Sequence, residues 1–271
     1  QSATPIYGET FDQVTVSGLV LATGTASGVG FFVTATDFTI PNGSTLSATG
    51  MGHPGGVGGW DGVNGWCGNG NGPGAGTCSA YGNPGAGYGG LGGWGDDRRP
   101  KYVGPSYGSL TNPAELGSGG AGGASYRRGG WGGGLIKLSV SGTLTLGGAI
   151  SSDGTDGDNN TVTSSTQSRY GSGAGGSGGA INITAATVTG AGKLTAAGGR
   201  GGNDVDGDPA GGGGGGRIAV VVTGTDSSTL SFDAGPGSGA NENSSSPASG
   251  GVGTVVWKRP GASLYDLKLL A

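Results

Sequence analysis

Residues 129–154 read GGWGGGLIKLSVSGTLTLGGAISSDG, and this stretch decides the fold. A glycine run is followed by alternating apolar and polar residues, a Gly-Gly pair and a second, shorter apolar segment. An alternation with a period of two predicts a β-strand with one buried face, and the Gly-Gly pair predicts a turn. The stretch therefore predicts a strand, a turn and a second strand, entered from a glycine-rich segment.

This pattern of strand, turn and strand recurs along the chain. Five units cover residues 31–50, 135–154, 180–199, 217–236 and 254–271, and a glycine run precedes each of the last four. Residues 14–23 predict one more strand near the N-terminus. Units of about 20 residues that bury an apolar face on their neighbours are typical of repeat folds. We therefore expect an all-β protein, either a parallel β-helix-like stack or a β-sandwich stack, with glycine-rich polyproline-II insertions.

Glycine supplies 71 of the 271 residues, so the backbone itself must require it. Between the first and second units, Val57, Trp60, Val63 and Trp66 recur every third residue among glycines. Three residues per turn is the period of the polyproline-II helix. We expect these four side chains to be buried along one stripe, the alternative being a disordered loop. The predicted regions are residues 1–50 with N-terminal strands, 51–131 as the glycine-rich insertion, and 132–271 with four β units.

Composition excludes two classes of protein. The net charge is −4 and 11% of the residues are charged, so no basic surface for nucleic acid is expected. No apolar run approaches the ~18–20 residues that span a bilayer. The chain begins at Gln1, which favours a processed mature form. Cys67 and Cys78 are too few for a zinc site and predict a disulfide rather than free thiols. These features favour an extracellular or cell-surface protein.

Three segments carry a resemblance to a known family. Residues 178–183 read GGAINI, 215–222 read GGRIAVVV, and 251–257 read GVGTVVW. They resemble a glycine-rich repeat of large secreted surface proteins, over about residues 124–271. The resemblance implies an extracellular β-helical architecture with glycine-rich insertions. Separately, the Gly-x-Gly triplets of residues 87–95 resemble glycine-rich antifreeze proteins built from bundled polyproline-II helices, although triplets cover only part of this chain.

Two acidic turns are candidate metal sites. Residues 153–160 read DGTDGDNN and residues 203–208 read NDVDGD. Closely spaced carboxylates resemble the first half of a calcium loop, although neither turn has the terminal glutamate of an EF-hand. The alternative is a solvated Asp-Gly turn. We predict Ca²⁺ as a cofactor, with the ligands Asp153, Asp156, Asp158, Asp204, Asp206 and Asp208.

Catalysis is not expected. The single histidine, His53, has no Gly-x-Ser-x-Gly partner, and no carboxyl group has a reason for a raised pKa. Tryptophan and tyrosine side chains of the insertion could stack on sugar rings, but burial between glycine-rich segments is the interpretation that we favour.

The sequence favours a structural subunit of an extracellular filament, sheath or surface layer. We expect copies to assemble head to tail, because the apolar terminal segments would expose unpaired strand edges. The alternatives are a carbohydrate- or ice-binding surface module and, third, a β-helical polysaccharide-active enzyme. The expected partners are further copies of the chain and surface polysaccharide. A loop that folds back over Leu267 and Leu269 is the alternative to an exposed end. The predicted interface residues are Val14, Val16, Leu19, Leu21, Leu264, Leu267 and Leu269.

Overall fold

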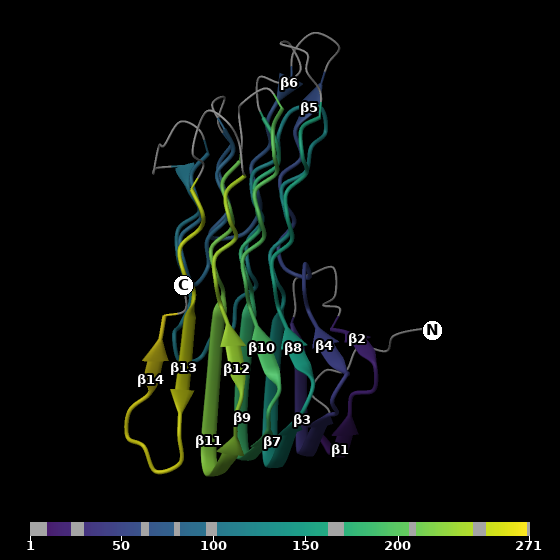
Figure 1. The fold of residues 1–271 in the computed structure, drawn as a ribbon, viewed down its shortest axis with the longest axis vertical. Helices are drawn as coiled ribbons and strands as arrows, with labels where there is room; N and C mark the ends of the chain where they lie inside the picture. Colours follow the sequence, from purple (N-terminus) through teal and green to yellow (C-terminus); the bar gives the residue numbers. More distant parts are fainter. Residues whose placement is uncertain are drawn as a thin grey trace.

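The computed structural model describes residues 10–22, 30–60, 65–78, 82–95, 102–161, 171–205, 210–240 and 248–269. In these ranges all regular elements are strands. The strands are β1 (Thr10–Thr15), β2 (Leu19–Leu21), β3 (Phe31–Ile40), β4 (Thr45–Ser47), β5 (Gly59–Trp60), β6 (Gly65–Trp66), β7 (Leu135–Leu146), β8 (Ala149–Ser151), β9 (Ala180–Gly190), β10 (Lys193–Thr195), β11 (Arg217–Ser228), β12 (Ser231–Asp233), β13 (Thr254–Lys258) and β14 (Asp266–Lys268). Apart from β5 and β6, they occupy one end of an elongated molecule, and glycine-rich segments extend towards the other end (Figure 1).

The strands form two large sheets. The seven-stranded sheet has the order β1-β3-β7-β9-β11-β13-β14, and the five-stranded sheet has the order β12-β10-β8-β4-β2. Every pairing in both sheets is parallel except that of β13 with β14. The short strands β5 and β6 pair only with each other. In the first four units, each strand therefore pairs with its equivalents in neighbouring units.

Matching apolar positions on successive strands build one core between the two sheets. In the seven-stranded sheet, Ile136 lies opposite Ile181, which lies opposite Ile218. In the five-stranded sheet, Ile150 lies opposite Leu194. All five side chains are fully buried. Because side chains alternate between the two faces of a strand, the same register directs the polar residues of the long strands outward.

The expected fold class, an all-β β-helix-like or β-sandwich stack with glycine-rich insertions, is wrong. The finding that overturns it is the pairing, which is parallel throughout the five-stranded sheet and in all but one pair of the seven-stranded sheet. Parallel strands need long crossover connections, and in α/β proteins helices supply them. Here the glycine-rich segments take that place. Residues 152–179, for example, connect β8 to β9, although residues 162–170 are outside the described ranges.

Hydrogen bonds between the glycine-rich segments recur every third residue. Gly173, Gly176 and Gly179 donate their N–H groups to the carbonyl oxygens of Asp158, Thr155 and Ser152, at N···O distances of 2.8, 3.1 and 2.7 Å. With three residues per turn, residues i and i+3 face the same neighbour. Each segment can therefore bond to several parallel or antiparallel neighbours at once.

The glycine-rich segments pack in three layers. The middle layer leads into β7, β9, β11 and β13, and its segments are residues 129–134, 171–179, 210–216 and 248–253. Segments that follow β8, β10 and β12 lie on one side of it, and segments from residues 51–124 lie on the other. Of the predicted insertion, the described segments of residues 51–124 therefore form one face of this bundle, and residues 129–131 belong to its middle layer.

The six consecutive glycines of residues 211–216 show why this segment of the middle layer needs glycine at each of its positions. A Cβ atom on Gly211 or Gly214 would meet the backbone of residues 82–95. One on Gly212 or Gly215 would meet residues 234–240, and one on Gly213 or Gly216 would meet residues 171–179. All three sides of this segment are thus in contact with another backbone.

The predicted buried stripe is wrong where the structure tests it. Val57 and Trp66 are 52% and 49% exposed. Val63 and the side chain of Trp60 lie outside the described residues. The reason is that a segment at the surface of the bundle turns its glycines inward, against other backbones. The residue at every third position, such as Val57 or Trp66, then faces solvent. The apolar stripe therefore lies on the side of the segment opposite to the buried glycines.

Substitution of Gly213 by alanine tests this packing. The added Cβ atom would overlap the Gly176 carbonyl, which other backbones hold in place. We expect Gly213→Ala to lower the free energy of unfolding by at least ~1–3 kcal/mol, the usual range for overpacking. The matched control is Gly235→Ala, whose Cβ atom would meet only the Asp233 carboxylate, at 3.2 Å. Denaturant unfolding measures both variants, and equal losses would contradict the three-layer packing.

Candidate functional site

The N-terminal end of the two sheets presents open strand edges. β1 is the outer strand of the seven-stranded sheet, and β2 is the outer strand of the five-stranded sheet. On β2, Leu19 and Leu21 are 68% and 54% exposed. Of the other predicted interface residues here, Val16 is buried and Val14 packs against the core of the same chain. Among the described residues of this end, the exposed large apolar side chains are therefore those of β2.

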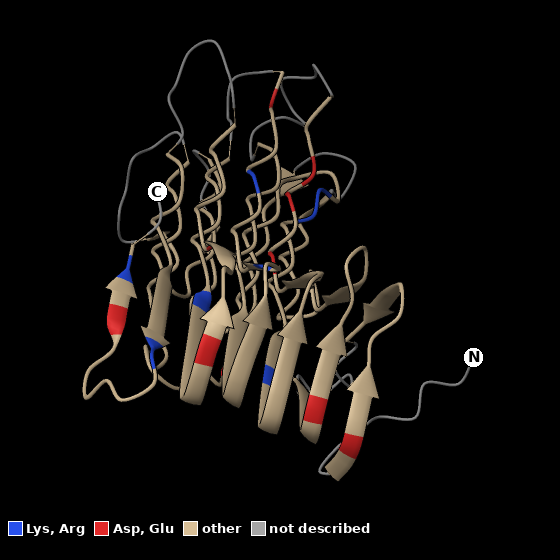
Figure 2. Cartoon of the chain, turned by 60° about the horizontal axis from the view of Figure 1, so that its bottom comes forward, with Lys and Arg blue, Asp and Glu red and all other residues tan. Residues whose placement is uncertain are grey.

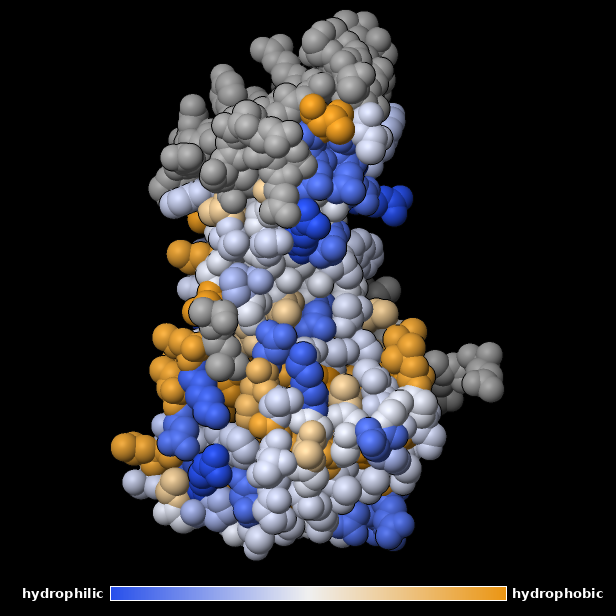
Figure 3. Space-filling view, in the orientation of Figure 1, coloured by the Kyte–Doolittle hydropathy of each residue, from blue (hydrophilic) through white to orange (hydrophobic). Residues whose placement is uncertain are grey.

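The C-terminal end is partly closed by the chain itself. β14 folds back antiparallel onto β13, with Leu267 opposite Val256. Leu264, Leu267 and Leu269 nevertheless stay more than half exposed, so no loop of the described chain covers them. The outer edge of β12 is also open in the five-stranded sheet. Hydrophobic surface appears on both sides of the strand region, at the β14 end and at the β2 end (Figure 3).

Charged groups close the core at the C-terminal end. Asp226 on β11 lies opposite Val188, at a position that is apolar on β9. Its buried carboxylate is 3.7 Å from Nη1 of Arg259, and the Arg259 guanidinium lies 4.4 Å from the centre of the Trp257 ring. β13 pairs only with residues 217–221 of β11, so the stretch that holds Asp226 is a local edge of the sheet. An inward charge on such an edge discourages continuation of the sheet at that position. The C-terminal side of the seven-stranded sheet thus carries a buried charge at this position.

The first acidic turn forms a ladder of hydrogen bonds with the neighbouring segment. Carboxylate oxygens of Asp153 and Asp156 accept the N–H groups of Ala197 and Arg200, both at 2.7 Å. Three residues further on, the side-chain oxygen of Asn159 accepts the N–H of Asn203 at 2.8 Å. In the opposite direction, Gly154, Gly157 and Asn160 donate to the carbonyl groups of Ala197, Arg200 and Asn203. The Asp-x-x-Asp-x-x-Asn spacing therefore matches the three-residue repeat of hydrogen bonds in the bundle.

The remaining predicted metal ligands lie apart from this ladder or outside the described residues. Asp158 accepts the N–H of Arg128, from a different segment. Asp204 is buried and accepts a hydrogen bond from the Asn160 amide at 2.9 Å. Asp206 and Asp208 are not among the described residues. Within the described chain, no three histidine, cysteine, aspartate or glutamate side chains converge. Calcium binding stays a prediction.

The melting temperature of the full-length protein tests calcium binding by both turns together. If the two turns bind Ca²⁺, addition of the ion to chelator-treated protein should raise the melting temperature by mass action. Asp206→Asn/Asp208→Asn should remove that increase while leaving the described ladder intact. An unchanged melting temperature in the unsubstituted protein would contradict the prediction.

Burial distinguishes Asp153 from the other acids of the turn. Desolvation raises the pKa of the Asp153 carboxyl group, and the nearby Asp233 carboxylate adds to this. The hydrogen bonds from the Ala197 N–H and the Thr195 hydroxyl, and the charge of Lys193, act in the opposite direction. Because the pKa is raised in the folded state, protonation of Asp153 stabilises the fold. That contribution is complete below the ordinary carboxyl pKa of about 4 and is lost as the pH rises through the raised value.

The variant Asp153→Asn tests this dependence. An amide keeps an oxygen that can accept the Ala197 N–H and has no charge to desolvate. We expect the stability of the variant, relative to the unsubstituted protein, to increase as the pH is raised from below about 4 to neutrality. Denaturant unfolding at a series of pH values measures the difference. Asp156→Asn is the control, since that side chain is exposed. A relative stability that falls with pH would contradict the assignment.

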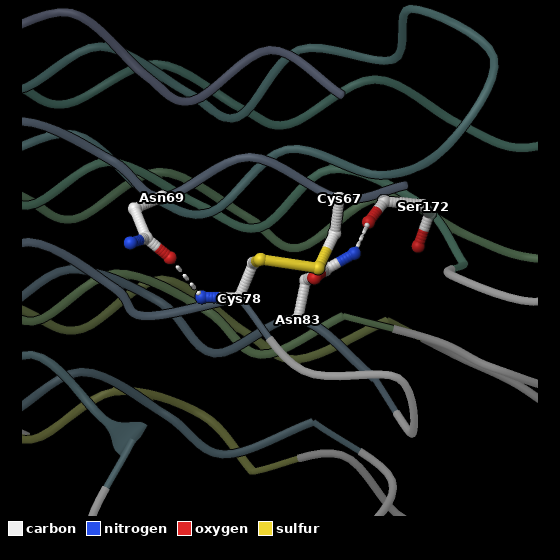
Figure 4. The surroundings of a disulfide bond; sticks show 5 residues. All are labelled: Cys67, Asn69, Cys78, Asn83 and Ser172. Carbon is white, nitrogen blue, oxygen red and sulfur yellow. Dashed lines mark hydrogen bonds between the residues drawn. A yellow bond between two sulfur atoms is a disulfide. The ribbon is translucent and has the colours of Figure 1, made fainter. Parts of the chain in front are cut away.

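The predicted disulfide is confirmed. Cys67 and Cys78 are bonded, with their Cα atoms 5.7 Å apart. The Cys78 N–H donates to the side-chain oxygen of Asn69 at 2.9 Å (Figure 4). Next to the disulfide, the Asn83 amide donates to the Ser172 carbonyl at 2.8 Å (Figure 4). The bridge thus constrains two short segments on the outer face of the bundle.

Sequence reasoning missed a buried polar cluster between the bundle and the seven-stranded sheet. Nε of Arg217, at the start of β11, donates to the Tyr107 carbonyl at 2.8 Å, and Nη1 donates to the Thr254 hydroxyl at 3.1 Å. The Tyr88 hydroxyl donates to the Glu115 carboxylate at 3.3 Å. Burial raises the pKa of both tyrosines and lowers the pKa of Arg217. The cluster attaches the outer segments to the sheet, and its only sequence signal was an arginine directly before the apolar residues of β11.

Comparisons with known proteins identify no relative. The chain matches no family model, no curated protein and no solved structure among those compared with it. In the described ranges, no helix is long and apolar enough to cross a lipid bilayer.

Proposed function

We propose that the protein is a structural subunit of an extracellular assembly in which copies join end to end. The observation that carries the proposal is the pair of unlike open ends. Leu19 and Leu21 are exposed on the outer strand β2, and Leu264, Leu267 and Leu269 are exposed around β14 at the opposite end. Natural proteins normally protect such edges with charges or bulges, because an open edge can pair with another chain.

The five-stranded sheet offers the more direct contact between copies. β12 and β2 are its two outer strands, and all its pairings are parallel. If β12 of one copy pairs with β2 of the next, the sheet continues without a change of direction. Leu19 and Leu21 would then lie near the leucines of the neighbouring C-terminal end. A contact between unlike surfaces forms an open filament unless its rotation closes a ring.

Charges at the two ends favour the same orientation. Lys258, Arg259 and Lys268 lie at the C-terminal end, where Arg259 pairs with the two nearby acids Asp226 and Asp266. The strand β1 at the other end carries the exposed Asp12 (Figure 2). Complementary charges steer association and suppress the wrong orientation. Like charges would meet if two C-terminal ends came together, and this disfavours contact between identical ends.

An extracellular setting is part of the proposal. The Cys67–Cys78 disulfide supports it, since disulfides persist in oxidising compartments and are rare in the cytosol. The bundle supports a structural role, because its side chains contribute little chemistry while its backbones are hydrogen-bonded to several neighbours.

Light scattering after size exclusion tests the assembly. We expect the average mass of the unsubstituted protein to rise with concentration and electron micrographs to show linear particles. Leu19→Lys/Leu21→Lys should shift the protein to monomer, because each substitution places a charge in the apolar contact. A strictly monomeric unsubstituted protein at high concentration would refute the proposal.

The control variant is Leu110→Lys. Leu110 is also an exposed leucine, but its segment lies over β9, where the Asn182 amide donates to the Asn112 side chain at 2.8 Å. This variant should assemble like the unsubstituted protein. Circular dichroism of all three proteins separates loss of assembly from loss of folding.

A further inference from the structure

The outer face of the seven-stranded sheet carries rows of hydroxyl groups that run from strand to strand. The parallel register sets these rows, because it places equivalent outward residues side by side. One row is Thr15, Thr39, Thr145, Thr189 and Ser227, on β1, β3, β7, β9 and β11. Two residues away on the same strands, Thr143, Thr187 and Thr225 form part of a second row. Beyond a bulge, Thr10, Thr34, Ser139 and Thr184 form a third.

The rows have regular spacing in two directions. Adjacent strands are ~4.7–4.9 Å apart, and two residues along a strand cover about 6.6 Å. Regularity of this kind does not contribute to the core, which lies on the other face of the sheet. Threonine is also common in strands because its β-branched side chain packs well on a pleated surface. The rows alone therefore do not identify a ligand.

A depression at one end of the rows provides the second observation. It has a volume of about 220 Å³, and its described lining comes from β1, β3 and β7. The lining residues are Gln13, Val14, Thr15, Asp37, Thr39, Thr143 and Thr145. Because Val14 packs into the core, the side chains available to a ligand are hydroxyl, amide and carboxylate groups. The volume is below the usual range for drug-sized ligands and suits a single sugar ring.

Asp37 is held in place within this depression. Its Oδ1 atom accepts the N–H of Thr143 on the neighbouring strand at 2.7 Å. The side chain is only partly buried, so the carboxylate also remains accessible from the solvent side. A carboxylate fixed by one hydrogen bond can accept O–H groups from two adjacent hydroxyls of a ligand, and charge-assisted bonds of this kind are the stronger ones. Gln13 lies opposite Asp37 on β1 and adds an amide donor and acceptor.

We propose that this face, called here the hydroxyl face, binds an extended neutral polysaccharide that lies across the strands. One sugar unit occupies the depression, with its vicinal hydroxyls on Asp37. Following units meet the hydroxyl rows on β7, β9 and β11. The length of a sugar unit in an extended chain is close to the strand spacing, so that one unit can contact each strand. Hydroxyl side chains both donate and accept hydrogen bonds, as the ligand hydroxyls do.

Charge selects a neutral ligand over an acidic one. The protein has a net charge of −4, and Asp37 is the charged group of the described lining. An acidic glycan would be repelled here. The described lining holds no aromatic ring, so recognition rests on hydrogen bonds rather than on stacking. The proposal is independent of end-to-end assembly, because the complete face belongs to one copy.

Affinity electrophoresis tests the proposal with soluble β-glucan, xylan and galactomannan cast separately in native gels. We expect at least one of these neutral polysaccharides to retard the protein, and acidic polygalacturonate to have no effect. The double variant Thr39→Val/Thr145→Val should bind at least about tenfold more weakly, because it removes two hydroxyls without a change of shape. Asp37→Asn should weaken binding by a similar factor.

The control is Thr77→Val, an exposed threonine of the glycine-rich bundle. It should bind like the unsubstituted protein, and equal melting temperatures show that all variants are folded. Absence of retardation in all three neutral polysaccharides would overturn the proposal, as would equal affinities for Thr39→Val/Thr145→Val and Thr77→Val. Inhibition of ice recrystallisation by the hydroxyl face without any polysaccharide binding would also overturn it, and would assign the rows to ordered water. None of these results depends on whether the protein assembles.

Discussion

Contact between one backbone and another, without side chains in between, is the constraint on which this structure depends. In the middle layer of the bundle, residues 211–216 meet three different segments with their three sides. Any Cβ atom there would overlap a carbonyl group, so glycine is required for space rather than for an unusual φ. None of these six glycines has a positive φ. The entropic cost of glycine is offset by hydrogen bonds that every third residue makes to a neighbouring segment.

This packing also explains how parallel sheets form without helices. A parallel strand pair needs a long return connection, and in most proteins a helix provides it while covering one face of the sheet. Here the return segments leave the sheets at one end and bond to one another. The two sheets are therefore free to face each other across a core of isoleucine, leucine and valine. On the outer face of the seven-stranded sheet, Thr34, Thr184 and Ser227 are exposed, so the hydroxyl rows can contact a ligand.

The acidic turns show how a local pattern can have a structural use that resembles a functional one. Asp153, Asp156 and Asn159 are three residues apart, which is the spacing needed to reach successive N–H groups of the neighbouring segment. Carboxylates that accept backbone N–H groups in this way satisfy donors that would otherwise need water. The same residues, considered as a sequence, resemble half of a calcium loop.

The sequence by itself determined where the strands lie and which segments must be rich in glycine. Period-two alternation located the long strands, as in residues 135–146, and period-three glycine indicated segments with three residues per turn. The Cys67–Cys78 bridge also followed from the sequence. The two periodicities depend on local backbone geometry alone. The partners of the strands and the direction of the exposed stripe were decided only by the tertiary structure, because both depend on which segment lies alongside. Trp66 is exposed and Tyr88 is buried within similar glycine triplets, since only Tyr88 is next to Tyr107 and Arg217. The hydroxyl face, likewise, exists only through the register that aligns five separate strands.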